Sequence, residues 1–219
     1  MTFDSRFKFI LGTMVFALAA DLVAWKLRAG WPAAALITAV INLVLLFYVI
    51  RQKDTLLAKL LFFGVLVGFG ELPTDHLAVA IQKTLVYPSD EPFIWSSPAY
   101  MPFSWTIVMT QFGYLAWWMT QRWGLAVATV LTGILGAVNL PAYEFLAKGA
   151  GFWYYRNATM VFFDSTPVYV IVGEFLLTLS IPYIVRQVER SRVIAIVAWS
   201  GVQSLLIYLS TVVAYHFFA

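Results

Sequence analysis

The stretch Glu71-Leu-Pro73-Thr-Asp75-His76-Leu-Ala78 places two carboxylates, an imidazole and a proline inside one apolar segment. An aromatic loop follows it and leads to Phe93-Ile-Trp-Ser-Ser-Pro98-Ala-Tyr100. The same order of features returns 69 residues later, as Glu144-Phe-Leu-Ala147 and then Phe162-Phe-Asp-Ser-Thr-Pro167-Val-Tyr169. We interpret the two stretches as copies of one unit; the alternative is that Ser/Thr-Pro is simply a good way to begin any helix. The matched pairs are Asp75 with Glu144, Leu77 with Leu146, Ala78 with Ala147, Phe93 with Phe162, Ser96 with Ser165, Ser97 with Thr166, Pro98 with Pro167 and Tyr100 with Tyr169.

The composition indicates the class of the protein. Apolar residues make up 62% of the 219 residues and charged residues 11%, against about half and a quarter in soluble domains. A soluble fold of this size could not bury so much apolar surface, so the sequence predicts an all-α integral membrane protein. The absence of cysteine excludes disulfides and thiolate catalysis. No basic patch interleaved with aromatic residues indicates nucleic acid as a partner.

Hydropathy divides the chain into spans. Crossing a bilayer core about 30 Å thick takes about 20 apolar residues of helix. By this measure the sequence predicts about seven transmembrane helices in a single transmembrane domain over 1–219. Proline interrupts two of them, at Pro73 and Pro141. The predicted spans are 8–28, 32–50, 56–84, 98–120, 124–147, 167–185 and 193–217.

The basic residues predict an orientation. Nine of the fourteen Lys and Arg residues fall at the N-terminus and in the second, fourth and sixth connections. Because positive residues favour the cytoplasm, we expect a cytoplasmic N-terminus and place the aromatic loops 85–97 and 148–166 outside. We expect the membrane to be a bacterial inner membrane. The proposed repeat units, about 56–120 and 124–185, then run in the same sense. They form a parallel internal repeat of helices three and four with helices five and six.

Five acidic residues fall in the outer half of the predicted helices, under the two aromatic loops. Ionisable residues in a membrane helix are costly and by default mark a functional site. Glu71 and Asp75 are four residues apart and so share a helix face. Two carboxylates in a low-dielectric cavity cannot both ionise cheaply, so one should keep its proton at neutral pH and be available for acid–base catalysis. The five acids are Asp21, Glu71, Asp75, Glu144 and Glu174.

We predict that Glu71 and Asp75 are the catalytic acid and base, and that Glu144 and Glu174 support the charge or a proton relay. Aromatic faces beside them can stabilise a cation by about 0.5–2 kcal/mol each, although interfacial belts enrich Trp and Tyr without any function. The alternative for the acids is structural hydrogen bonding alone. Carboxylates and one imidazole from predicted helices three, five and six offer an alternative, a site for a divalent metal ion. No His-x-x-x-His or Glu-x-x-His spacing is present, so we expect no metal and no cofactor. The expected substrate-binding residues are His76, Trp95, Tyr100, Trp105, Trp153, Tyr169 and Asp21.

A chain of this length with seven spans, intramembrane acids and many aromatic residues resembles the small integral-membrane terpene cyclases and, more loosely, membrane carotenoid cyclases and hydratases. The resemblance is one of architecture, because the Pro-x-Glu-Glu/Asp element of the carotenoid cyclases is absent and the last span has no acid. The chain is also similar to many uncharacterised polytopic bacterial membrane proteins. The cyclase resemblance implies a membrane-embedded enzyme that acts on an isoprenoid or other lipid by carboxylate acid–base chemistry.

Two other functions remain open from the sequence. A proton-coupled transporter fits the paired repeats and proline-broken helices. A non-catalytic subunit that binds pigment, lipid or partner helices in a membrane complex, or a homo-oligomer, fits acids that face a partner.

Overall fold

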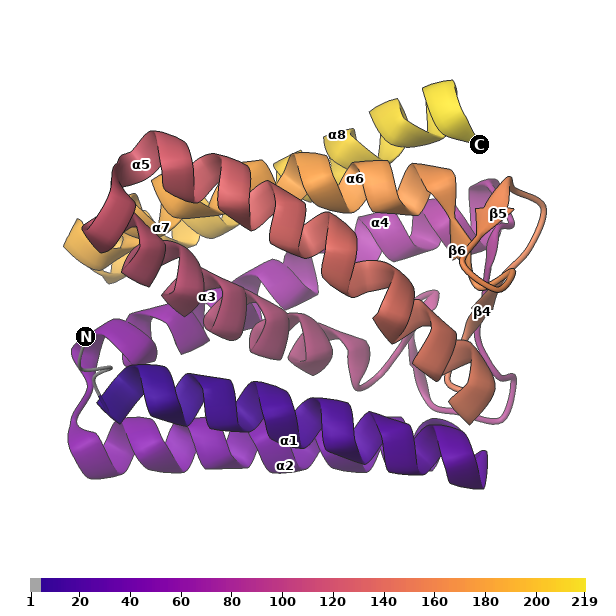
Figure 1. The fold of residues 1–219 in the computed structure, drawn as a ribbon, viewed down its shortest axis with the longest axis horizontal. Helices are drawn as coiled ribbons and strands as arrows, with labels where there is room; N and C mark the ends of the chain where they lie inside the picture. The colour runs from indigo at the N-terminus through magenta and orange to yellow at the C-terminus, as the bar shows by residue number, and fades with distance from the viewer. Residues whose placement is uncertain (1–4) are drawn as a thin grey trace.

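The computed structural model describes residues 5–219, which are arranged as a bundle of long helices with short strands gathered at one end (Figure 1). The protein is all-α, with 79% of its residues helical. In the described part of the chain, six helices are long and apolar enough to cross a membrane. The helices are α1 (Ser5–Leu27), α2 (Trp31–Gln52), α3 (Thr55–Gly70), α4 (Leu72–His76), the π-helix η1 (Leu77–Ile81), α5 (Met101–Ala150), α6 (Val168–Leu179), α7 (Ile181–Arg190) and α8 (Val193–Phe218).

Helix α5 contains a sharp reversal. Its 50 residues would be about 75 Å long as a straight helix, far more than a bilayer core of about 30 Å. Gly124 has φ 79° and ψ 167°, a region that is essentially limited to glycine. Figure 1 shows the chain turning back here, so that 101–123 and 125–150 form a helical hairpin.

Proline and a π-turn break the helix that begins at Thr55. Helix α3 ends at Gly70, and α4 begins with Pro73 in its first turn. Pro73 has no N–H, so the usual bond to the carbonyl of Phe69 cannot form. The carbonyl of Glu71 accepts the N–H groups of Thr74 and Asp75 at 2.7 and 3.3 Å instead. Glu71, Thr74 and Asp75 are buried at this break, which lies toward the end of the bundle where the strands are found.

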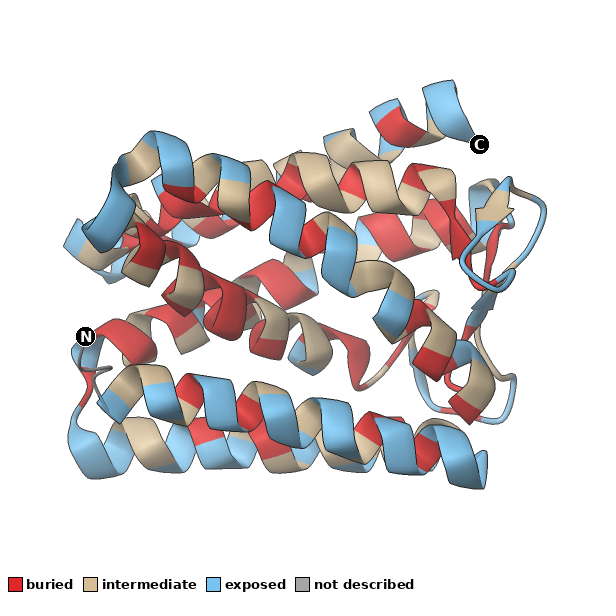
Figure 2. Cartoon of the chain, in the orientation of Figure 1, coloured by how far each residue is buried: buried red, intermediate tan, exposed pale blue. Residues whose placement is uncertain are grey.

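The closest helix packing is between α3 and the first half of α5. A Cβ on Gly68 would lie 2.0 Å from the carbonyl oxygen of Pro102, and one on Gly64 would lie 2.8 Å from that of Thr106. Only glycine permits this approach of two backbones. Figure 2 shows buried residues concentrated on these two helices, while α1, α2 and the second half of α5 expose much of their outer surface. Large apolar side chains such as Phe47 and Ile194, 70% and 86% exposed, would face lipid.

Three short antiparallel strand pairs cover one end of the bundle. Strand β1 (Leu85–Val86) pairs with β4 (Tyr154–Tyr155), although 69 residues separate them in the sequence. The other two pairs are local hairpins, β2 (Phe93–Ile94) with β3 (Ser97–Pro98) and β5 (Met160–Val161) with β6 (Thr166–Pro167). The β1–β4 pair joins the two aromatic loops into one cover.

Candidate functional site

A cavity of about 310 Å³ lies in the centre of the bundle, beneath the joined loops. Helices α1, α2, α4, α5, α6 and α8 all contribute to its wall. This volume is at the lower end of the range for small-molecule pockets. No Lys, Arg or His is among the lining residues that belong to the described chain. The acids that line it are Asp21, Glu71, Asp75, Glu144 and Glu174.

The carboxyl groups of Glu71 and Asp75 contact each other. Asp75 accepts hydrogen bonds from Ser97 and from the hydroxyl of Tyr87, the second at 3.0 Å. Within residues 5–219, Oε2 of Glu71 and Oγ1 of the nearby Thr74 are both buried and have no hydrogen-bond partner of normal geometry. Two carboxyl groups can share a hydrogen bond only when one carries a proton. Ser97 and Tyr87 therefore fix the carboxyl group of Asp75 beside that of Glu71.

Glu144 has a similar arrangement on the second half of α5. Its Oε2 accepts a hydrogen bond from the indole Nε1 of Trp153 at 2.7 Å, within buried surroundings. Its charge also interacts with Tyr155 of strand β4. Asp75 and Glu144 thus each receive donors from an outer loop, which fixes the orientation of both carboxyl groups.

Asp21 and Glu174 complete the acidic set. Asp21 is 6% exposed and lies in the wall of the cavity. Within residues 5–219 no hydrogen bond or ion pair holds its carboxyl group, although Tyr143 lies within reach of its charge. Glu174, on α6, is close enough to Glu144 for their charges to interact. The two carboxyl groups are therefore available to a molecule in the cavity.

Two half-buried tyrosines in the loops are donors to the site. Burial raises the pKa of Tyr87 well above its ordinary value, and the nearby Asp75 and Glu71 add to the shift. Burial likewise raises the pKa of Tyr155, with Glu144 the next largest cause. Both phenols therefore stay protonated and can donate hydrogen bonds to the carboxylates. The hydroxyl groups of Thr84 and Tyr169 form a hydrogen bond of 2.7 Å near these two tyrosines.

The structure brings together most of the residues expected from the sequence. Beside the five acids, the lining includes Tyr100, Trp105, Trp153 and Tyr169. His76 and Trp95 lie apart from the cavity: their rings stack at 4.1 Å, His76 Nδ1 is 2.8 Å from Ser96 Oγ, and Trp95 is 61% exposed.

Other residues at the site did not emerge from the sequence. Tyr87, Tyr143 and Tyr155 line the cavity, and Ser97 holds Asp75 from outside it. The only sequence signal for the tyrosines is their density in and beside the aromatic loops, which does not separate them from an interfacial belt.

Glu91 is a further acid that the sequence did not single out. It is 5% exposed although it lies in the loop between β1 and β2. Burial raises its pKa to about 7, and the charge of Asp90 adds to the shift. Its carboxyl group lies beside the hydroxyl of Tyr100, yet neither carboxyl oxygen makes a hydrogen bond of normal geometry.

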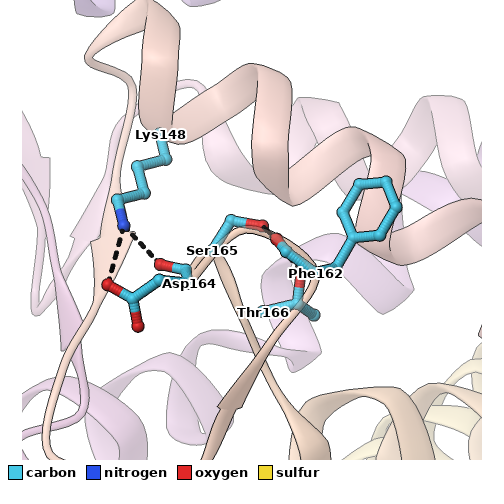
Figure 3. A network of polar contacts seen from close by, with 5 residues as sticks. All are labelled: Lys148, Phe162, Asp164, Ser165 and Thr166. Atoms are coloured by element: carbon cyan, nitrogen blue, oxygen red, sulfur yellow. Dashed lines mark hydrogen bonds and ion pairs between the residues drawn. The ribbon is translucent and has the colours of Figure 1, made fainter.

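The second loop is tied to the end of α5, outside the cavity. Figure 3 shows Lys148 reaching both the backbone carbonyl and the carboxylate of Asp164, the latter at 3.4 Å. Phe162, Phe163 and Asp164 all have positive φ, and Ser165 Oγ donates to the carbonyl of Phe162 at 2.6 Å. Lys148 is thereby engaged at the surface and does not neutralise the acids of the cavity.

Residues 72–218 match the model of a domain of unknown function, DUF6989. The chain belongs to the DUF6989 family. The DUF6989 match begins at α4 and so includes Asp75, Glu144 and Glu174, whereas Asp21 and Glu71 precede it. No curated protein and no solved structure matches the chain.

Proposed function

We propose that this protein is a membrane-embedded enzyme that acts on an isoprenoid or other lipid by carboxylate acid–base chemistry. The contact between the carboxyl groups of Glu71 and Asp75 in the wall of the central cavity is the observation that supports the proposal. In this proposal Glu71 carries a proton and can donate it. The carboxylate of Asp75, held by its hydrogen bonds, lies next to Glu71 as a proton acceptor. Positioned acid–base groups contribute about 10²–10⁴-fold to a rate.

In the proposed reaction Glu71 gives its proton to a carbon–carbon double bond or an epoxide of the substrate. At a double bond the π electrons form the new C–H bond. At an epoxide an oxygen lone pair forms the O–H bond and one C–O bond breaks, with its electron pair staying on oxygen. In both cases a carbocation remains. The faces of Trp105 and Trp153 in the cavity wall stabilise this charge. Loss of a neighbouring proton to a carboxylate, Glu144 or Glu174, then forms a new double bond. For a cyclic product, the π electrons of a second double bond first attack the carbocation and form the ring C–C bond, and the cation that results then loses the proton. If water adds to the carbocation instead and gives up a proton to a carboxylate, the product is a hydrate. The proton taken up by the carboxylate returns to Glu71 before the next turnover.

The wall of the cavity supports a substrate that arrives from the bilayer. Leu18 of α1 lines the cavity and is 52% exposed. Asn139 and Ala142 of α5, on either side of Pro141, also line it and are exposed. All three lie within helices that are long and apolar enough to span the membrane. An opening between α1 and α5 at this depth would admit a lipid sideways.

A proton-coupled transporter has less support from the same wall. A transport path would have to continue from the acids to the opposite end of the bundle. In that direction the lining side chains are mostly apolar, among them Ile41, Ile107 and Ile207, and the polar Gln111 donates its amide to Thr13.

We further propose seven crossings, a cytoplasmic N-terminus and an outer, extracytoplasmic position for the cavity. The reversal at Gly124 supports two crossings within α5. The chain has no cysteine, so a single introduced cysteine is a unique label. Ser89→Cys, in an exposed outer loop, should react with an impermeant maleimide added outside spheroplasts. Gln121→Cys, at the exposed turn before Gly124, should react only after the membrane is opened; labelling of both from outside would refute this topology.

Duplication of the unit is also part of the proposal, and two equivalent contacts support it. The paired strands β1 and β4 lie 69 residues apart, so that each copy pairs with the same segment of the other. Gly64 packs on Thr106, and Gly133 packs on Phe175; both partners of the second contact are 69 residues beyond those of the first. A local two-fold relation between the copies accounts for both contacts.

The test of the enzymatic function uses Glu71→Gln and Asp75→Asn in proteoliposomes supplied with an extract of the host's total lipids. Mass spectrometry should find a lipid converted to an isomer, or to a species heavier by water, with wild-type protein. Each variant should lower the rate at least about 100-fold and still unfold cooperatively. Glu189→Gln is the control, because Glu189 hydrogen-bonds Trp117 away from the cavity. Folded variants that turn the substrate over at the wild-type rate would refute the proposal.

A further inference from the structure

We infer that the cavity is built to bind a lipophilic organic cation, such as a protonated amine attached to an apolar tail. The inference deepens the proposed function by naming the charge of the ligand. It concerns binding, and it is tested without turnover.

The first observation is the charge of the wall. Five carboxyl groups line the cavity, and no basic side chain does so among residues 5–219. Basic residues of the protein are engaged elsewhere: Arg6 lies 2.5 Å from Asp54, and Lys59 donates to the carbonyl of Glu189 at 2.6 Å. Burying an unpaired carboxylate is costly. The acids must therefore all stay neutral or be balanced by a charge that the ligand brings.

The second observation is that some of these acids lack partners while they are nine-tenths buried. Glu71 is 3% exposed, and its Oε2 has no hydrogen-bond partner. Asp21 is 6% exposed and, within the described residues, makes no hydrogen bond or ion pair. By contrast, Asp75 and Glu144 are satisfied by Ser97 and Trp153. Within residues 5–219, the carboxyl group of Asp21 and the Oε2 atom of Glu71 are thus left without a hydrogen-bond partner, whereas Ser97 and Trp153 hold Asp75 and Glu144 in place.

The spacing of the acids favours an organic cation over a metal ion. A metal ion needs several oxygens within about 2.0–2.6 Å of one centre. No group of three or more His, Asp or Glu within 5–219 is close enough to hold one. The acids instead come from four different helices, α1, α4, α5 and α6, and from Glu71 where α3 meets α4. An alkylammonium group is larger and more diffuse than a metal ion, so carboxylates spread around a cavity can attract it together.

The rest of the wall suits the remainder of such a ligand. Trp105 and Trp153 offer aromatic faces, which attract organic cations. Met14, Leu18 and Ile37 are apolar and lie on α1 and α2. Because Leu18 is also exposed on the outside of the bundle, an alkyl tail could leave the cavity on this side and stay in lipid.

The experiment compares two ligands of equal chain length, N,N-dimethyldodecylamine and 1-dodecanol, at pH 7 in a neutral maltoside detergent. The shift of the melting temperature, followed by intrinsic tryptophan fluorescence, reports binding. The wild-type protein should bind the amine at least tenfold more tightly than the alcohol, about 1.4 kcal/mol. Asp21→Asn combined with Glu71→Gln should remove this preference and leave the affinity for the alcohol unchanged. Glu189→Gln, the matched acid outside the cavity, should retain the preference.

Equal affinities for amine and alcohol in the wild-type protein would overturn the inference. A preference that survives in Asp21→Asn/Glu71→Gln would overturn it as well, because the charge would then be sensed elsewhere. If the double variant does not fold, Asp21→Asn alone replaces it and should weaken amine binding severalfold. Loss of turnover in Glu71→Gln together with no amine preference would leave the proposed enzyme in place and show that its ligand is neutral.

Discussion

The contact between Gly68 and Pro102 gives the sharpest prediction for the stability of the bundle. A Cβ at position 68 would lie 2.0 Å from the carbonyl oxygen of Pro102 and 2.8 Å from its carbonyl carbon. Ordinary carbon–oxygen contacts are no shorter than about 3.3 Å, so Gly68→Ala must push α3 and α5 apart by about 1.3 Å. Both obstructing atoms belong to the backbone, and no side-chain rotation can relieve the clash.

Overpacking usually costs about 1–3 kcal/mol, and a backbone clash belongs at the upper end of that range. For a chain of this size, 3 kcal/mol lowers the melting temperature by about 6–12 °C. Tryptophan fluorescence during heating in detergent measures the change. Gly201→Ala is the control, because a Cβ there meets nothing within 4 Å, and it should melt within about 2 °C of wild type. If Gly68→Ala melts together with Gly201→Ala, the described helix contact is wrong.

Three further predictions concern the loops and the turn. Ser97→Ala removes a buried donor to Asp75 and should cost about 1.5–3 kcal/mol in chemical or thermal unfolding; Ser97→Thr, which keeps the hydroxyl, should cost less, and equal losses would contradict the role of the hydrogen bond. Glu91 has a pKa raised to about 7 by burial, so the folded state holds its proton more tightly than the unfolded state and stability should fall as pH rises from about 4.5 through 7. Glu91→Gln should remove about 1–2 kcal/mol of this fall, and a melting curve with unchanged pH dependence would count against it. Gly124→Ala meets no atom within 4 Å but forces alanine into a region limited to glycine, so a loss of about 1–3 kcal/mol is expected; a melting temperature equal to that of Gly12→Ala would refute the described turn.

Part of the candidate site could be predicted from the sequence, and part could not. The depth of Asp21, Glu71 and Asp75 along their helices followed from the rise per residue, and the structure places all three in one cavity. His76 and Trp95 were expected beside them, but they stack on each other away from the cavity. His76 follows Asp75 directly, and consecutive residues on a helix point about 100° apart, so depth alone does not place a side chain at a site.

The loops show the same limit. Tyr87 and Tyr155 reach the cavity because β1 and β4 pair across 69 residues of sequence. No local pattern predicts that pairing, since it depends on contacts between segments that meet only after the helices have packed. Glu91 is buried for the same kind of reason: it lies in a loop by sequence and beside Tyr100 in space.

The sequence by itself determined that this is a helical membrane protein and that Pro73 breaks a helix. The break predicted at Pro141 was wrong, because α5 continues as a helix through this proline and leaves helical geometry only at Gly124. Hydropathy and helical rise are sums over neighbouring residues, so they can be read along the chain. The tertiary structure decided which side chains share the cavity, which carboxyl groups have donors and which remain free. Those facts depend on how each helix is rotated about its axis and on close backbone approaches such as Gly68 on Pro102, which are properties of the packed bundle.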